Sequence, residues 1–505
     1  MNSFLRLLKN YRLDELLLGI GDLTRKMFDG QKAVITVPVT RYQQVHAPIG
    51  TRILQQYGNV TISAWSLLEI SYYSILHTND FAVNTPTFDN IIQLCNEYIE
   101  FENTLSSKVY QDATSQKRLL FDLFGLSQKE FWLQELHTIK EQFNRDVEML
   151  EVIPHQIEQT LNLDAILTEI SGFDVRSLRK ILFSIFAMGM VNSNLSSLTV
   201  DQSIKNVDKV LTKENILSVI ESYTAEYQEC RGSPFKHGFF YSKPIVRTTK
   251  GKYIVVNQFL VAKKIADGVF WKLRDYFAAK SESESREFTK QFGNLFEKYV
   301  HNLLSYYLKG DQFKRIPEGP GERADWIITT SRYQLIVEQK SGLMSLMLKD
   351  IHVDLKKYND YLLKMKKGVV QLDRTAVAYE SQEKTTLKFL LFYDQLYMYE
   401  NILKEELISI SGKNLTDNKN FFLIHIGDFE HLVQILSEAE SIFNRIMEEK
   451  IQLEKEPSPE GKDFNQVIRK HYDKENLYIH NHLNHYDNYI GQIASVNNQE
   501  ANSSA

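Results

Sequence analysis

The segment Arg323-Ala-Asp-Trp-Ile-Ile-Thr-Thr-Ser-Arg-Tyr-Gln-Leu-Ile-Val-Glu-Gln-Lys340 decides the fold of the C-terminal part of the chain. Its two arms, on either side of Ser331-Arg332, are rich in Ile, Val, Tyr, Trp and Thr, which favour β-strands. If the arms pair antiparallel about that turn, residues whose numbers sum to 663 lie opposite one another. Asp325 then faces Glu338, and strand alternation puts Lys340 on the same face as Glu338. The segment therefore predicts a hairpin that brings two carboxylates and an ammonium group together.

This group of side chains suits the hydrolysis of a phosphodiester bond. The reaction needs charge neutralisation at the phosphoryl group, an activated water and a stabilised leaving oxygen, all of which a carboxylate-held Mg²⁺ supplies. Asp325, Glu338 and the backbone carbonyl of Gln339 provide the oxygen ligands that Mg²⁺ prefers, and Mn²⁺ is the expected substitute ion. We expect Lys340 to orient or help deprotonate the attacking water and to offset phosphate charge.

The spacing of these residues has a known parallel. Asp325, followed after twelve residues by Glu338-x-Lys340, resembles the core of the PD-(D/E)xK nuclease superfamily, to which restriction endonucleases belong. Glu-x-Lys also occurs at 448–450 and 460–462, but in a charged helical run and a Pro-flanked linker, where no strand would hold it. The chain departs from the family name at one position, where Ala324 replaces the Pro.

The flanking segments extend the resemblance over residues 286–436. Residues 287–308 form an amphipathic pattern that contains Glu297 and is similar to the first helix of that superfamily with its acidic residue. Downstream, a basic helical region ends near Gln371, similar to the Gln that follows Glu-x-Lys in some branches. The resemblance implies that Glu297 completes the metal ligands or holds a metal-bound water. It also implies that Gln371 positions the water or contacts a phosphate.

The function implied by the resemblance is that of a Mg²⁺-dependent nuclease, with DNA favoured over RNA as substrate. Its arrangement with a separate helical half is similar to bacterial restriction and anti-phage defence effectors. The alternative is a non-catalytic nucleic-acid-binding or interaction protein built on a degenerate nuclease fold. The joint presence of Asp325, Glu338 and Lys340 favours the enzyme.

Composition places the chain among globular proteins. Of its 505 residues 43% are apolar and 24% charged, and no uncharged apolar run is long enough to span a membrane. With no secretory signal and only two cysteines, Cys95 and Cys230, we expect a cytoplasmic protein without a disulfide framework or a thiolate zinc site. The net charge of −5 means that nucleic acid must bind at a local basic patch.

Residues 1–230 are expected to form a mostly helical regulatory or recognition domain, through which the chain binds a partner protein or forms a homo-oligomer. Helix caps and apolar spacing predict its elements. They are a helix over 14–28, a short edge strand over 33–39, a helix from Thr85-Pro86 to 105, a capping box at 127–130 that opens a helix to 151, and helices capped by Asp174 and by Thr212, the latter ending near 228.

The remainder is predicted to contain three parts, so the fold class is mixed α+β. Residues 231–285 form a connector with a hairpin about Lys250-Gly251, a helix over 260–277 and a polar break at 281–285 that marks the main boundary. Residues 286–436 form the nuclease-like domain, a mixed sheet with helices on both faces. Its other strands are expected at 312–316, 386–393 and 421–426, and residues 437–505 add the rest of a helix over 428–454 and a polar tail.

Three further features allow two interpretations each. A lysine-rich run is either a DNA-facing surface or a solvated helix face; its members are Lys349, Lys356, Lys357, Lys364, Lys366 and Lys367. His480, His482 and His485 have metal-like spacing, but a loose polar tail is the favoured interpretation. Trp326 is expected in the core rather than as a platform for base stacking.

Overall fold

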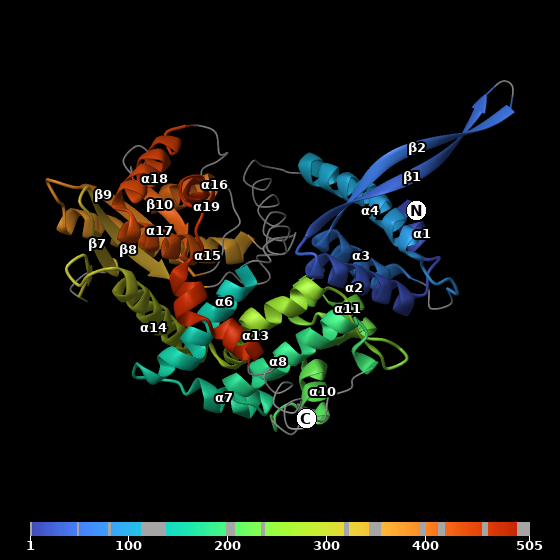
Figure 1. Cartoon of the computed structure of the whole chain (residues 1–505), viewed down its shortest axis with the longest axis horizontal. Helices are drawn as coiled ribbons and strands as arrows, with labels where there is room; N and C mark the ends of the chain where they lie inside the picture. Colours follow the sequence, from blue (N-terminus) through green and yellow to red (C-terminus); the bar gives the residue numbers. More distant parts are fainter. Residues whose placement is uncertain are drawn as a thin grey trace, which may run out of the picture.

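The computed structural model is a mixed α+β protein with sheets of five, three and two strands. The five-stranded sheet lies at one end of the longest axis, and the two-stranded ribbon projects from the other end (Figure 1). None of the helices that the structure describes combines the length and apolar character needed to cross a membrane. The structure describes residues 3–47, 50–78, 82–112, 138–197, 208–233, 238–317, 323–342, 355–393, 400–412, 420–456 and 463–491.

The five-stranded sheet has the order β10-β9-β8-β7-β6. β6, β7 and β8 pair antiparallel, whereas β8, β9 and β10 pair parallel. This is the mixed sheet predicted within residues 286–436. Its strands are β6 (Phe313–Arg315), β7 (Trp326–Thr329), β8 (Tyr333–Lys340), β9 (Thr385–Phe392) and β10 (Phe421–His425).

The central hairpin has the predicted register. Trp326 pairs with Val337, and the other three pairs of β7 and β8 also sum to 663. The N–H of Thr330 donates to the carbonyl of Tyr333 at 2.9 Å, which closes a two-residue turn at Ser331-Arg332. Alternation sends Trp326 to one face, where it is buried as predicted, and Ile327 to the other.

Helices cover both faces of the sheet (Figure 1). Helices α15 (Leu355–Ala378) and α16 (Glu400–Ser411) pack on the face that contains Ile327 and Ile336. The opposite face packs against α14 (Glu282–Tyr307), α17 (Ile426–Glu438), α18 (Glu440–Leu453) and α19 (Phe464–His471). The predicted single helix over 428–454 is wrong, because Ala439 has a non-helical backbone and separates α17 from α18.

The middle of the chain is mainly helical and contains a three-stranded sheet. As predicted, Asp174 and Thr212 cap their helices through their side chains, but the second helix ends at Ser222 because β3 begins at Thr224. The predicted capping box at 127–130 lies outside the described residues. The elements are α6 (Thr138–Val147), the π-helix η1 (Glu148–Val152), η2 (Ile153–His155), α7 (Leu163–Ser171), α8 (Val175–Val191), η3 (Leu195–Ser197), α10 (Lys213–Ser222), β3 (Thr224–Glu226), α11 (Tyr227–Gly232), α12 (Gly238–Ser242), β4 (Ile245–Arg247), β5 (Tyr253–Val255) and α13 (Gln258–Lys280).

The N-terminal part contains more β-structure than its sequence predicts. The expected short strand over 33–39 is the base of a long antiparallel pair, β1 with β2. The helix expected from Pro86 begins at Phe88 instead, because the side chains of Thr87 and Asn90 cap each other's backbone N–H groups. The elements are α1 (Ser3–Leu8), α2 (Leu13–Asp29), β1 (Val34–Ala47), β2 (Gly50–Ser63), α3 (Ala64–His77) and α4 (Phe88–Asp112).

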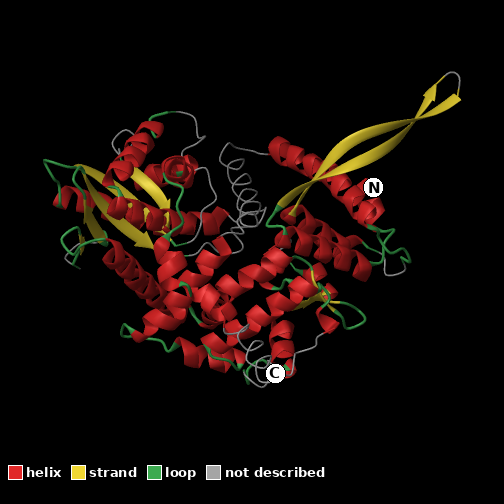
Figure 2. Cartoon of the chain, viewed as in Figure 1, coloured by secondary structure: helices red, strands yellow, loops and turns green. Residues whose placement is uncertain are grey.

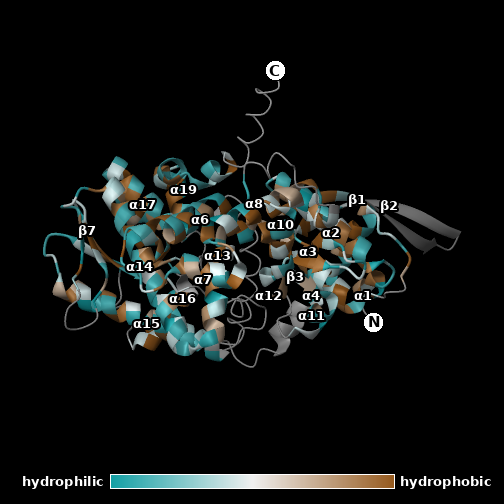
Figure 3. Ribbon diagram, turned by 90° about the horizontal axis from the view of Figure 1, so that it is seen from below, coloured by the Kyte–Doolittle hydropathy of each residue, from teal (hydrophilic) through white to brown (hydrophobic). Residues whose placement is uncertain are grey.

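The expected polar break at 281–285 is helical except for Ser281, which caps α14 directly after α13 ends at Lys280. The apolar core is continuous across this point, because Phe277 stacks on Phe288 and Phe270 contacts Phe292. Hydrophobic residues gather along α3 and α8 in the helical part (Figure 3). The division of the chain into four domains stays a prediction.

A buried ion pair ties the helical part to the sheet region. Arg145 of α6 donates through Nε and Nη2 to the two carboxylate oxygens of Glu430 in α17, both at 2.7 Å. Tyr299 of α14 also donates to Glu430, at 2.6 Å. Glu430 is fully buried, so three helices meet at one carboxylate.

Glu430→Ala should therefore lower the free energy of unfolding by about 3 kcal/mol or more, because it leaves Arg145 buried with Glu141 as its remaining acidic partner. The control is Glu448→Ala, which breaks the exposed pair with Arg332 and should cost under about 1 kcal/mol. Urea unfolding followed by circular dichroism measures both. Equal losses in the two variants would contradict a structural role for the buried pair.

Candidate active site

The hairpin brings Asp325 and Glu338 together at its open end. Asp325 directly precedes β7, and its N–H donates to the carbonyl of Val337 at 3.0 Å, which continues the ladder by one residue. Its Oδ2 accepts the N–H of Gln339 at 2.8 Å. Glu338 lies within β8 and is 2% exposed, whereas Asp325 is partly exposed. The pair is thus held by backbone hydrogen bonds and is open on the Asp325 side.

Ionisation of Glu338 is made more costly by its burial and by the neighbouring Asp325. Burial is the main cause that raises the pKa of Glu338, and the neighbouring charge of Asp325 raises it further. Burial also raises the pKa of Asp325, although the Gln339 N–H and the Lys340 charge oppose the shift. No described N–H or O–H group donates to the buried Oε2 of Glu338. The charge of the ionised pair is therefore only partly compensated by its described neighbours, and its oxygens fit a hard cation.

Lys340 lies beside the pair, as predicted. Its ammonium donates to Glu338 Oε1 and, at 3.1 Å, to Oε1 of Gln371 in α15. Gln371 in turn donates through Nε2 to the carbonyl of Arg323 at 3.0 Å. Gln371 is therefore brought into the site, where it connects Lys340 to the segment that leads into Asp325.

Two residues that sequence reasoning missed also hold this segment: Thr375 in α15, and Tyr379, which directly follows that helix. Thr375 is fully buried, and its Oγ1 accepts the N–H of Ala324 at 2.8 Å. Tyr379 accepts a long hydrogen bond from Arg323 at 3.5 Å, and the guanidinium lies 5.8 Å from the centre of its ring. Thr375 and Tyr379 follow Gln371 at intervals of four residues, which is the signal in the sequence that could have found them.

Gly368 lets α15 approach the site closely. A Cβ at this position would lie 2.6 Å from Leu390 Cδ1, 2.8 Å from Lys340 Cε and 3.3 Å from Glu338 Cγ. Such distances are shorter than ordinary carbon contacts, so a side chain here would displace Lys340 or Leu390. Gly368 is therefore a positioning residue for Lys340.

Gly368→Ala should move Lys340 and reduce activity at the site by about tenfold or more, because displacements near 1 Å at a reacting centre have effects of this size. The net loss of stability should be about 1 kcal/mol, since the higher helix propensity of Ala offsets part of the cost of overpacking. Gly293→Ala in α14 is the matched control, because its nearest neighbour, Ser341 Oγ, would lie 3.5 Å away. Activity and melting temperature of both variants provide the test, and equal activities would contradict this role.

Glu297 and Gln339 lie close to the pair but in other arrangements. Glu297 forms an ion pair with Arg315 of β6 at 2.5 Å, and its charge contributes to the raised pKa of Asp325. Gln339 accepts a side-chain hydrogen bond from the indole of Trp326 at 3.2 Å. Within the described ranges, no three His, Cys, Asp or Glu side chains are grouped closely enough to hold a metal ion. The ligand roles of Glu297 and of the Gln339 carbonyl stay predictions.

The structure leaves the prediction for the lysine-rich run untested but changes the interpretation of the histidine-containing tail. Lys356, Lys364 and Lys367 are exposed on α15, Lys366 is half-buried, and Lys349 lies outside the described residues, so a DNA-facing role stays a prediction. The tail is not loose over residues 463–491. His480 contacts Glu141 at 3.3 Å, His485 contacts Glu148 at 3.0 Å, and His482 packs against Tyr306, so each histidine has a separate packed environment.

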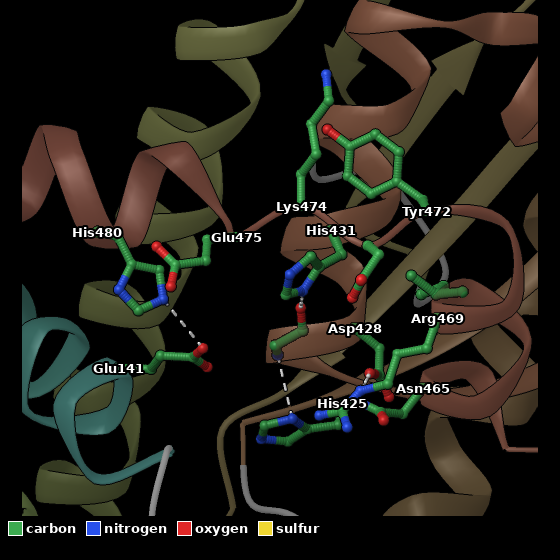
Figure 4. Close-up of a pocket in the computed structure, with 13 residues that line it drawn as sticks. Glu141, His425, Asp428, His431, Asn465, Arg469, Tyr472, Lys474, Glu475 and His480 are labelled. Carbon is green, nitrogen blue, oxygen red and sulfur yellow. Dashed lines mark hydrogen bonds and ion pairs between the residues drawn. The ribbon is translucent and has the colours of Figure 1, made fainter.

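A polar cavity of about 280 Å³ lies at the same edge of the sheet. Lys340 pairs with Phe392, and Phe392 with His425, which lines the cavity where β10 leads into α17. His480 points towards Glu141 (Figure 4). The backbone of Gly427 forms hydrogen bonds with the rings of His425 and His431. The charged groups of its lining have both signs: Glu141, Asp428, Asp473, Glu475, Arg469 and Lys474.

No family model matches the chain, and neither a curated protein nor a solved structure was found that matches it.

Proposed function

We propose that the chain is a Mg²⁺-dependent nuclease with a restriction-endonuclease-like fold. The observation that carries this proposal is the meeting of Asp325, Glu338 and Lys340 on one face of the hairpin, beside a buried Glu338 oxygen that receives no hydrogen bond from the described residues. A carboxylate pair with an adjacent ammonium group is an arrangement that suits phosphodiester hydrolysis.

Each residue has a role that follows from its position. Asp325 and Glu338 would hold the ion, which supplies charge neutralisation at the phosphoryl group and a more acidic water when bound. Lys340 is partly exposed, so its ammonium can orient a water and stabilise negative charge on a phosphate oxygen. Gln371 keeps Lys340 in place through its Oε1, and Thr375 fixes the backbone next to Asp325.

The proposal favours an enzyme over a non-catalytic binding protein for a physical reason. A buried carboxylate next to a second, partly exposed one costs the native state free energy unless a cation compensates the pair. A protein that only bound nucleic acid would gain by replacing one of them, because negative charge also repels phosphate. The pair is therefore best understood as a site built for a metal ion.

Purified protein incubated with plasmid, linear DNA and RNA, with Mg²⁺ or with EDTA, tests the proposal. We expect cleavage of DNA with Mg²⁺ or Mn²⁺ and none with EDTA. Binding without cleavage under every metal tested would instead support the non-catalytic alternative. Cleavage that persists in EDTA would contradict the role of the carboxylate pair.

A further inference from the structure

The β1–β2 ribbon extends beyond the body of the protein (Figure 2). Its base is anchored, because Val60 and Ile62 are buried and Ile35 and Val37 pack against the N-terminal core. The pairing continues without interruption from Val34 opposite Ser63 to Ala47 opposite Gly50. At about 3.4 Å per residue, a strand of this length spans roughly 45 Å, so the distal half is an arm of more than about 20 Å.

The ribbon lies in a long stretch of clear charge bias at this end of the chain. Residues 30–68 contain no Asp or Glu, whereas Lys32, Arg41 and Arg52 are basic. The chain has 64 acidic residues in 505, so about five would be expected in these 39 positions at the average frequency. The arm is thus locally positive on a chain whose net charge is −5, which is the local basic patch that nucleic-acid binding requires.

The composition of the distal part fits a phosphate backbone. Between Thr40 and Tyr57 the sequence has two arginines and also four glutamines, two tyrosines and two threonines, residue types that are common hydrogen-bond partners of phosphates. Arg41 pairs with Gln56 and Arg52 with Val45. Because positions 41 and 45 differ by an even number, both arginines belong to the same face of the ribbon.

The dimensions fit duplex DNA. Two strands about 4.8 Å apart form a ribbon that the major groove, about 12 Å wide, can admit. We propose that the distal part of the β1–β2 ribbon, residues 40–47 and 50–57, is a DNA-binding arm that contacts duplex DNA away from the cleavage site. The choice of nucleic acid as partner rests on the proposed nuclease function. The ribbon and the five-stranded sheet lie at opposite ends of the long axis, so the arm contacts DNA that flanks the cleaved bond (Figure 1).

Three variants and one control test the arm. Arg41→Ala with Arg52→Ala removes both charges, and Arg41→Lys with Arg52→Lys keeps them. A third variant replaces residues 40–57 by Asn-Gly, which closes the ribbon after the pair of Val39 with Gly58. The control is Arg286→Ala with Lys470→Ala, which removes the same charge from side chains that are 77% and 65% exposed on other surfaces.

Binding to a duplex of about 40 base pairs, roughly four helical turns, is measured by fluorescence anisotropy in EDTA, so that no cleavage occurs. Salt is varied between about 50 and 200 mM. The double Ala variant should bind about 10- to 100-fold more weakly near 100 mM salt. Its slope of log K against log salt should become shallower by about 1.8, or about 0.9 for each phosphate that one of the two arginines neutralises. The Lys variant and the control should keep the wild-type slope, and the shortened ribbon should bind at least as weakly as the Ala variant.

The proposed DNA-binding arm and the proposed nuclease function can be contradicted separately. If wild type and the double Ala variant have equal duplex affinity and an equal salt slope, the ribbon is not a DNA-binding arm, even if the protein cleaves DNA. Loss of self-association on shortening the ribbon, seen by light scattering, without any duplex binding by the full chain would show that the ribbon pairs with a second copy instead. Ribbon-dependent binding by a chain that never cleaves would leave the arm intact and contradict the nuclease.

Discussion

Lys340→Ala is expected to reduce nucleic-acid cleavage by about 10² to 10⁴-fold, the usual loss when a positioned acid-base or electrostatic group is removed. The variant keeps Asp325 and Glu338, so metal binding should survive. It should also remain folded, because the ammonium is partly exposed and its loss leaves no buried cation. Single-turnover cleavage with saturating Mg²⁺ separates this loss of rate from a loss of metal binding.

The matched control is Lys388→Ala on the neighbouring strand β9. Lys388 is also a lysine paired with a carboxylate, at 2.8 Å from Asp373, and it lies on the same sheet away from the carboxylate pair. Its removal should change the stability of the protein rather than the cleavage rate of the folded chain. If Lys340→Ala and Lys388→Ala cleave as fast as wild type, the activity belongs to another site or to a contaminant.

Asp325→Asn should abolish most Mg²⁺-dependent stabilisation and activity, because a neutral amide is a poorer ligand for a hard dication than a carboxylate. A wild-type protein with Mg²⁺ at about 100 times its dissociation constant gains roughly 2.7 kcal/mol. The variant should gain much less at the same concentration. Without metal it should melt no lower than wild type, because the substitution removes repulsion between two carboxylates.

Melting curves in EDTA and across a Mg²⁺ titration measure this prediction. Asp373→Asn is the control, since it neutralises another acid on the same side of the sheet that pairs with Lys388. Its Mg²⁺-dependent gain should equal that of the wild type. An unchanged gain in Asp325→Asn would place any bound ion elsewhere.

The hairpin and its carboxylate pair could be predicted because their information is local. Two β-rich arms about a short turn fix the register, and the register fixes which residues face one another. The sum of 663 followed from the turn alone, and it placed Asp325, Glu338 and Lys340 on one face. Strands β9 and β10 were predictable for the same reason, since each contains a short apolar run.

The rest of the site depends on packing that no short stretch encodes. Thr375 and Gly368 contact the hairpin only because α15 lies across it in one rotation, and nothing near them in sequence specifies that rotation. Gln371 was expected from the family resemblance alone. The β1–β2 ribbon was underestimated because Pro38 counts against a long strand, although a two-stranded ribbon consists entirely of edges that tolerate it. The helix break at Ala439 was also missed, because no Gly or Pro at that position indicates the end of a helix.

The single non-helical residue between α13 and α14 has a consequence for how this protein can be divided. A fragment that starts at residue 286 would begin inside α14 and would leave Phe288 and Phe292 without Phe277 and Phe270. Such a fragment exposes aromatic surface and should be recovered in inclusion bodies rather than as a working module. Transfer of the hairpin site to another protein would therefore have to include α13. The same requirement applies to recombination, because a segment that carries the site without α13 would lack part of its core.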